Sequence, residues 1–216
     1  MREFDAIRAA LAGRVPRALE FPELTRAAVL IPVLRRGADA TVVFTLRSEN
    51  VEHHKGEISF PGGRCEEGED APRAALREAL EEIGLDPARV EIAGRLDDAV
   101  SVSRYAVTPV VGLCTDPPER CRAQESEVRE VFEVPLRELL DPARFRSEWR
   151  DVSRLPDGTP LEALMRIAVE TGDVDAVKGR YRALSFDLGP GRVVWGLTAR
   201  ILRNFLEVAF GFATGR

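Results

Sequence analysis

The chain has 216 residues, of which 44% are hydrophobic and 31% are charged, so it is long enough to bury one substantial core and has an ordinary globular composition. Its net charge of −5 argues against a general nucleic-acid-binding protein, because contacts with a phosphate backbone need a positive face. Three cysteines do not make a disulfide framework, and no Cys-x-x-Cys pair indicates a structural zinc site.

No apolar run predicts a secretion signal or a membrane span. Charged side chains interrupt the first eight residues, and the apolar tail at 193–212 carries Arg200, Arg203 and Glu207, as an amphipathic helix does. We therefore expect a cytoplasmic protein with no membrane partner.

Helical and strand-like segments follow each other along the chain without regular alternation. Apolar residues at helical spacing predict a first helix that ends at Gly13. Strands are predicted at 28–34, 41–46, 90–96, 107–113, 128–134 and 193–195. Further helices are predicted at 71–83, 136–140, 161–169 and 198–210. This mixture predicts a single α/β sandwich domain over residues 1–216.

The helix at 71–83 has the clearest signals. Asp70 can cap its start, Pro72 suits its first turn, and Gly84 suits its end. At about 100° per residue, Glu78, Glu81 and Glu82 lie within about 100° of one another. We expect the opposite side of the helix to pack on the sheet, through Leu76, Ala79, Leu80 and Ile83.

Three carboxylates this close repel one another unless a cation or an arginine compensates them. Grouped hard oxygen ligands suit Mg²⁺ or Mn²⁺, which take one or two carboxylates and bind substrate phosphates with the rest of their shell. An isolated Glu-x-x-Glu-Glu is more often a solvated helix face than a metal site. The residues around it are therefore needed to choose between these two interpretations.

The stretch from 63 to 85 resembles the Nudix box, G-x5-E-x7-R-E-U-x-E-E-x-G-U, where U is a bulky aliphatic residue. The matching positions are Gly63, Glu69, Arg77, Glu78, Glu81, Glu82, Gly84 and Leu85, with Ala79 as a small residue at a U position. The resemblance implies a Nudix hydrolase with an α/β/α sandwich fold, a mixed β-sheet and a Mg²⁺ or Mn²⁺ cofactor.

The resemblance also implies roles for individual residues. Glu78, Glu82 and the carbonyl of Gly62 would be the metal ligands, and Glu81 a further ligand or a partner that orients water. Arg77 would hold Glu69 and orient the carboxylates, while Gly63 and Glu69 would be structural. A metal so held would polarise a diphosphate and lower the pKa of the attacking water.

The residues before the box resemble the signature of coenzyme A diphosphatases, L-L-T-x-R-S-x3-R-x3-G-x3-F-P-G-G. The matching positions are Thr45, Arg47, Ser48, Gly56, Phe60, Pro61, Gly62 and Gly63. The resemblance implies that coenzyme A or an acyl-CoA is cleaved to 3′,5′-ADP and (acyl-)4′-phosphopantetheine. Arg47, His54, Lys55 and Arg64 are the residues expected to bind this substrate.

Glu52 departs from that signature, which has arginine at this position. In one alternative, the Glu52 carboxylate faces the ligand and repels it, and His53, His54 and Lys55 supply the positive charge that the arginine would have given. In the other alternative, Glu52 faces water and has little effect on binding. His53 and His54 are themselves either phosphate ligands or simply exposed.

Two regions beyond the box remain open. A further carboxylate is expected to act as ligand or base, and Glu127 is preferred over Glu125 and Glu130, although each is also compatible with a solvated loop. The segment at about 156–180 has no counterpart in the family. Its apolar spacing suits core or interface packing better than a lid over pantetheine, and the sequence is compatible with a homodimer.

Two rival functions remain. One is a Nudix hydrolase of ADP-ribose, NADH or another nucleoside diphosphate derivative, against which the 47–63 block argues. The other is a non-catalytic ligand sensor, which would be expected to lose box carboxylates that are all present here.

Overall fold

The computed structural model describes residues 2–19, 24–48, 56–101, 104–151, 174–175 and 179–213. The bounds of the helices are α1 Arg2–Leu11, α2 Ala71–Ile83, α3 Leu136–Leu139 and α5 Gly196–Phe210. The bounds of the first eight strands are β1 Thr25–Arg36, β2 Asp39–Arg47, β3 Ile58–Ser59, β4 Gly62–Arg64, β5 Glu91–Arg95, β6 Ala99–Val100, β7 Tyr105–Cys114 and β8 Val128–Pro135. The remaining strands are β9 Phe145–Asp151, β10 Val174–Asp175, β11 Arg180–Asp187 and β12 Val193–Trp195.

The main sheet, built from β1 to β8, is mixed. Its central path runs β3-β2-β1-β7-β5, with β4 beside β1, β6 beside β7 and β8 beside β2. β1 and β7 are parallel over ten residue pairs, whereas the other pairings are antiparallel. A parallel pair in the centre requires a long connection between β1 and β7, and that connection contains the box and α2.

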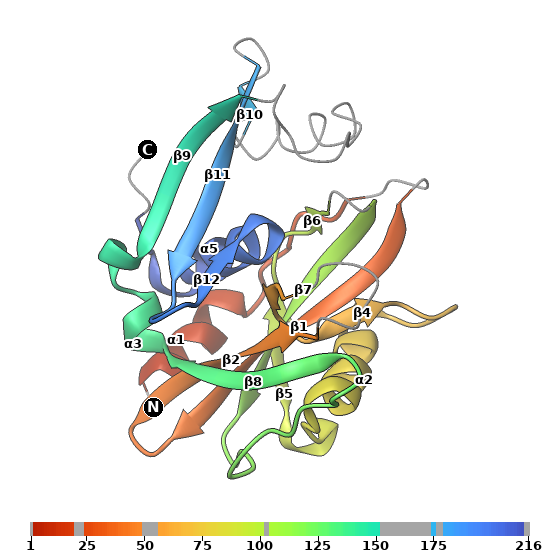
Figure 1. Cartoon of the computed structure of the whole chain (residues 1–216). Helices are drawn as coiled ribbons and strands as arrows, with labels where there is room; N and C mark the ends of the chain where they lie inside the picture. Colours follow the sequence, from red (N-terminus) through yellow and green to blue (C-terminus); the bar gives the residue numbers. More distant parts are fainter. Residues whose placement is uncertain are drawn as a thin grey trace.

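Helices cover both faces of this sheet, because its central strands are apolar on both sides (Figure 1). One face packs on α2 through Leu30, Leu34, Val43 and Val110. The other packs on α1 and α5 through Ile31, Val33, Phe44 and Val111. Successive residues therefore alternate between two cores, as the two-residue period of a strand dictates. The expected α/β/α sandwich with a mixed sheet is confirmed.

A second, smaller sheet contains β9, β10, β11 and β12, and sequence reasoning predicted only β12 of it. β9 reads Phe-Arg-Ser-Glu-Trp-Arg-Asp and is exposed from Arg146 to Asp151. It therefore lacks the apolar alternation by which a strand is recognised. The predicted helix at 161–169 and most of the segment at 156–180 lie outside the described residues.

Within the described residues, no helix is long and apolar enough to cross a membrane.

Candidate active site

Two glycines let the loop before α2 pass close to its neighbours. β4 pairs with β1 at Val29↔Gly62 and Ala28↔Gly63. A Cβ on Gly62 would lie 2.4 Å from the carbonyl oxygen of Ala28, and one on Gly63 would lie 2.4 Å from Oε1 of Glu78. Any side chain at either position would therefore push the loop away from β1 or from the Glu78 carboxylate.

The ends of α2 are those predicted from the sequence. Asp70 accepts a hydrogen bond from the backbone N–H of Arg73 at 2.9 Å, and Pro72 lies in the first turn. Gly84 ends the helix in the left-handed region at φ 64°, and its N–H returns to the last turn. The register of the box carboxylates is thus set locally.

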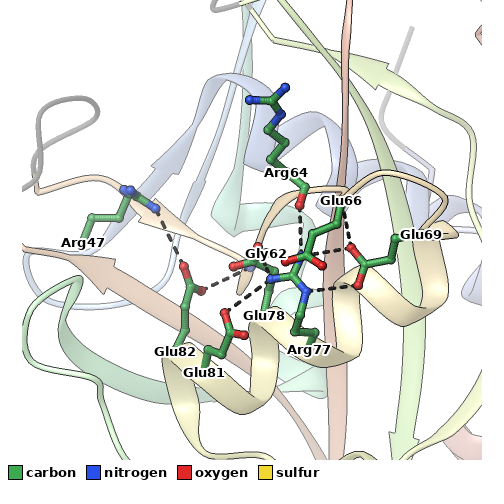
Figure 2. Close-up of polar contacts among 9 residues, drawn as sticks. All are labelled: Arg47, Gly62, Arg64, Glu66, Glu69, Arg77, Glu78, Glu81 and Glu82. Carbon is green, nitrogen blue, oxygen red and sulfur yellow. Dashed lines mark hydrogen bonds and ion pairs between the residues drawn. The ribbon is translucent and has the colours of Figure 1, made fainter.

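The predicted packing face of α2 was partly wrong. Its buried side is formed by Ala71, Ala75 and Ala79 together with Glu82, whereas Leu80 is 47% exposed. Small alanines let the helix lie close to the sheet, and Glu78 and Glu82 share their side of it. The two carboxylates therefore point into the space between α2 and the β2–β4 region instead of lying opposite the core (Figure 2).

Arg77 is the centre of a network that holds the box together (Figure 2). Its Nε and Nη2 donate to the two carboxylate oxygens of Glu69, both at 3.0 Å. Its Nη1 donates to Glu78 at 2.9 Å and to Glu81 at 3.3 Å. Nη2 also donates to the carbonyl of Arg64 at 3.0 Å, so one guanidinium ties the loop to the helix.

Glu69 is braced a second time, since it accepts the backbone N–H of Glu66 at 2.9 Å. The hydrogen bonds from Arg77 and Glu66 hold the pKa of Glu69 below its usual value. The contacts of Arg77 and Glu66 thus favour the ionised form of Glu69, as expected of a brace between the loop and the helix.

Glu82 is the most enclosed carboxylate of the group. The residue is 4% exposed, and one oxygen accepts the N–H of Gly62 at 3.2 Å. Nη1 of Arg47 lies 4.0 Å from the other oxygen. Burial raises the pKa of Glu82 to about 8, against the Gly62 hydrogen bond and the charge of Arg47. Its ionised form therefore lacks sufficient positive compensation.

Glu78 is also short of compensation, although it contacts Arg77. Burial raises its pKa more than the ion pair with Arg77 lowers it, and the charges of Glu81 and Glu127 raise it further. Glu127 raises the pKa of Glu82 as well. Glu127 thus lies near both carboxylates, at the turn where its carbonyl accepts the N–H of Ser48 at 2.8 Å.

The other two acids considered with Glu127 are placed differently. Glu130 forms a short ion pair with Arg192, whose guanidinium lies over the ring of Phe132. Glu125 is exposed in the turn before β8. Of the three acids, Glu127 is the one whose charge is a leading cause of the raised pKa of both Glu78 and Glu82.

The structure places the four residues that were expected to bind substrate differently. Arg47 reaches the site and faces Glu82, and its buried Nε has no hydrogen-bond partner among the described residues. Arg64 contributes its carbonyl to Arg77, but its exposed side chain points away from the carboxylates (Figure 2). His54 and Lys55 lie outside the described residues, as does Glu52.

The carboxylates suit a divalent cation without forming a closed cage. Within the described residues, no three acidic, histidine or cysteine side chains are arranged around one point as metal ligands. Mg²⁺ and Mn²⁺ need only one or two carboxylates, however, because water and substrate oxygens fill the other positions. Glu82 is enclosed and lies one helical turn from Glu78, and its ion pair with Arg47 spans 4.0 Å, so the two carboxylates fit such an ion.

Sequence reasoning missed three contacts of this site. They are the approach of Arg47 to Glu82, the donation from Gly62 N–H to Glu82, and the brace from Glu66 to Glu69. Only the last had a local signal, since Glu66 and Glu69 are three residues apart in a tight loop. The first two join residues that are far apart in the chain.

Comparisons with known proteins agree with the box. The model of the NUDIX domain matches residues 24–155. The Escherichia coli K12 protein named uncharacterized Nudix hydrolase NudL is 38% identical over 181 residues, covering 83% of this chain and 80% of that protein. Its counterpart from strain CFT073 is 37% identical over the same length.

Solved structures are more distant. The MutT protein of Methanosarcina mazei Go1 has a TM-score of 0.44 at 23% identity, covering 57% of this chain and 84% of that one. The NUDIX domain of Shewanella oneidensis NrtR, solved with ADP ribose, has a TM-score of 0.43 at 18% identity, covering 70% and 90%.

Proposed function

We propose, from the premise that this chain belongs to the NUDIX domain family, that it hydrolyses the diphosphate bond of coenzyme A or an acyl-CoA. The proposed products are 3′,5′-ADP and (acyl-)4′-phosphopantetheine. The observation that carries the hydrolase assignment is the under-compensated pair Glu78 and Glu82, held in place by Arg77 and Gly62.

Glu78, Glu82 and the Gly62 carbonyl are the groups proposed to hold Mg²⁺ or Mn²⁺. When bound, the ion would polarise the diphosphate and make water a better nucleophile. The chain contributes preorganisation: Arg77 prevents Glu69, Glu78 and Glu81 from moving apart, and Gly62 fixes one oxygen of Glu82. Carboxylates that are already positioned need no reorganisation during the reaction.

Glu127 and Arg47 have proposed roles next to this pair. Glu127 is exposed and close enough to affect both carboxylates, so it is placed to accept the proton of the attacking water. The side chain of Arg47 is 27% exposed and lies beside Glu82, which supports a role for its guanidinium in contacting a substrate phosphate.

The assignment of coenzyme A rests on the block from Thr45 to Gly63, which extends beyond the general box. The test is product analysis after incubating the protein with coenzyme A, ADP-ribose and NADH, each with Mg²⁺, with Mn²⁺ and with a chelator. We expect 3′,5′-ADP from coenzyme A, only with metal. If kcat/KM for ADP-ribose is higher by tenfold or more, the coenzyme A assignment is wrong and a nucleoside-diphosphate hydrolase remains.

Glu52→Arg sharpens this test, because the coenzyme A signature has arginine there. If Glu52 faces the ligand, the substitution should lower KM for coenzyme A and change its salt dependence. Unchanged kinetics would indicate that Glu52 faces water.

A further inference from the structure

One long strand edge of the molecule is left without a partner. β9 pairs with β11 along one edge, from Phe145↔Phe186 to Asp151↔Arg180. Among the described residues, nothing pairs with its other edge. Figure 1 shows β9 and β11 rising side by side from α5 and the main sheet, with β9 on the outside. Such an edge presents free N–H and C=O groups to any strand that can align with them.

The side chains of β9 carry charges of both signs. It carries no proline or lysine, and its exposed charges alternate in sign: Arg146, Glu148 and Arg150 share one side. Trp149, on the opposite side, is 39% exposed and is held by the guanidinium groups of Arg182 at 5.0 Å and Arg180 at 5.3 Å. A fixed aromatic side chain at the middle of an edge is typical of an association surface.

The alternation makes β9 complementary to itself in only some registers. In an antiparallel pair, directly opposed residues share a face, so a symmetric pair must be centred on one residue. In a pair centred on Glu148, the Glu148 side chains of the two copies face each other, and Arg146 of each copy faces Arg150 of the other. In a pair centred on Arg150, the two Arg150 side chains face each other. Both registers therefore bring like charges together. Centring on Trp149 opposes each Glu148 to Arg150 of the second copy and the two indoles to each other.

A register centred on Ser147 also opposes unlike charges, Arg146 to Glu148. In that register, however, Arg150 and Asp151 of one copy would face the 3-10 turn at Pro142–Arg144 of the other copy. This turn precedes β9 and is not extended as a strand is. The strand start is also anchored in the core, since the ring of Phe145 lies 5.0 Å from that of Phe186. The register centred on Trp149 lies farther from the turn and from Phe145, and within β9 it aligns residues 147–151 of the two copies.

We propose that β9 pairs antiparallel with β9 of a second copy of this chain, about a two-fold axis at Trp149. The two small sheets then become one continuous sheet across the dimer. Glu148 and Arg150 are a charge pair within each copy and supply two reciprocal pairs between copies.

The test uses charge reversal at the two positions and sedimentation equilibrium of the full chain. We expect the wild type to sediment as a dimer. Glu148→Arg alone opposes two pairs of arginines, and Arg150→Glu alone opposes two pairs of glutamates. Each should weaken self-association by about tenfold or more. Mixing the two single variants makes unlike charges face each other again, so the mixture should form a heterodimer.

Recovery in the mixture separates this interface from a folding defect, because a misfolded variant would not be rescued by the other. The double variant Glu148→Arg with Arg150→Glu should also dimerise. Arg146→Glu is the matched control: it should have little effect in the register centred on Trp149, but would abolish the attraction in the one centred on Ser147. A monomeric wild type, or single variants whose mixture stays monomeric, would overturn the proposal.

Discussion

Two arginines in this molecule bind a glutamate in nearly the same way. Arg36 uses Nε and Nη2 for the two oxygens of Glu133 and Nη1 for the carbonyl of Pro118. Arg77 uses Nε and Nη2 for the two oxygens of Glu69 and also donates to the carbonyl of Arg64. In both places a guanidinium joins a regular element to a loop.

The two clusters differ in charge balance. At Arg36, one cation meets one anion, and Thr41 adds a hydrogen bond at 2.6 Å. Burial alone would raise the pKa of Glu133, but the bonds from Arg36 and Thr41 outweigh it and keep the pKa below its usual value. At Arg77, one guanidinium contacts three carboxylates, and Glu82 lies close by. The Arg36 cluster is thus balanced in charge, whereas the Arg77 cluster carries an excess of negative charge.

The largest expected effect is a loss of turnover when one negative charge is removed from the Arg77 cluster. Glu82→Gln keeps the size and the hydrogen bond to Gly62 but removes the negative charge, so turnover should fall by several orders of magnitude. Glu133→Gln makes the same change in the balanced cluster and should leave kcat unchanged. Steady-state kinetics and thermal melts measure both. Near-normal activity of a folded Glu82→Gln variant would contradict the ligand assignment.

The next effect is obtained by removing each arginine in turn. Arg77→Ala frees three carboxylates and should lower kcat by about 10- to 100-fold, as the loss of a residue that orients metal ligands does. Arg36→Ala should lower the unfolding midpoint and leave kcat unchanged, because it leaves only Glu133 unpaired. Equal kinetic losses in the two variants would show that Arg77 acts only through stability.

A third effect concerns stability against pH without metal. Burial raises the pKa of Glu82 to about 8 in the folded protein, against 4.5 for an unperturbed glutamate, so folding favours its protonated form. Stability should therefore fall as pH rises from about 4.5 to about 8, by up to about 1.4 kcal/mol per pH unit. Glu82→Gln should lack this loss, while Glu81→Gln, whose side chain is 56% exposed, should behave as the wild type. Denaturant unfolding in EDTA measures it, and parallel curves for all three proteins would refute the burial of an ionisable Glu82.

The smallest effect has the opposite sign and belongs to the balanced cluster. Because the pKa of Glu133 is lowered, its stabilising contribution is present above the unfolded value near 4.5 and is lost as pH falls through the folded value. At neutral pH, Glu133→Gln should be less stable than the wild type by about 1 kcal/mol. The difference should disappear in acid. A difference that persists below pH 3 would assign the effect to packing instead of charge.

Local signals in the sequence predicted the elements around the box well. The bounds of α2 follow from Asp70, Pro72 and Gly84, and apolar runs predicted the five longer strands β1, β2, β5, β7 and β8 of the main sheet. The short strands β3, β4 and β6 were not predicted. β9 and β11 were not predicted, because their exposed or mixed residues show no face that must be buried. Their pairing is a long-range property, formed between residues about 35 positions apart.

The residues of the candidate site were predictable in identity but not in environment. The spacing of the box places Glu78 and Glu82 one turn apart, since the helical repeat alone determines that. It does not determine that Glu82 is buried, because its burial arises where the alanine face of α2 meets the sheet and where β4 passes over β1. Glycines 62 and 63 indicate such a passage only once their neighbours in space are known.

By itself the sequence determined the helix, its caps and the set of oxygen ligands, since these depend on residues within a few turns of one another. Only the tertiary structure decided which carboxylates lack compensation, because that depends on guanidinium groups brought from β2 and from α2 itself to different distances. It also decided which strands pair with one another in the part of the chain that the structure describes, because hydrogen bonds of a sheet are shared between segments that the chain order does not place together.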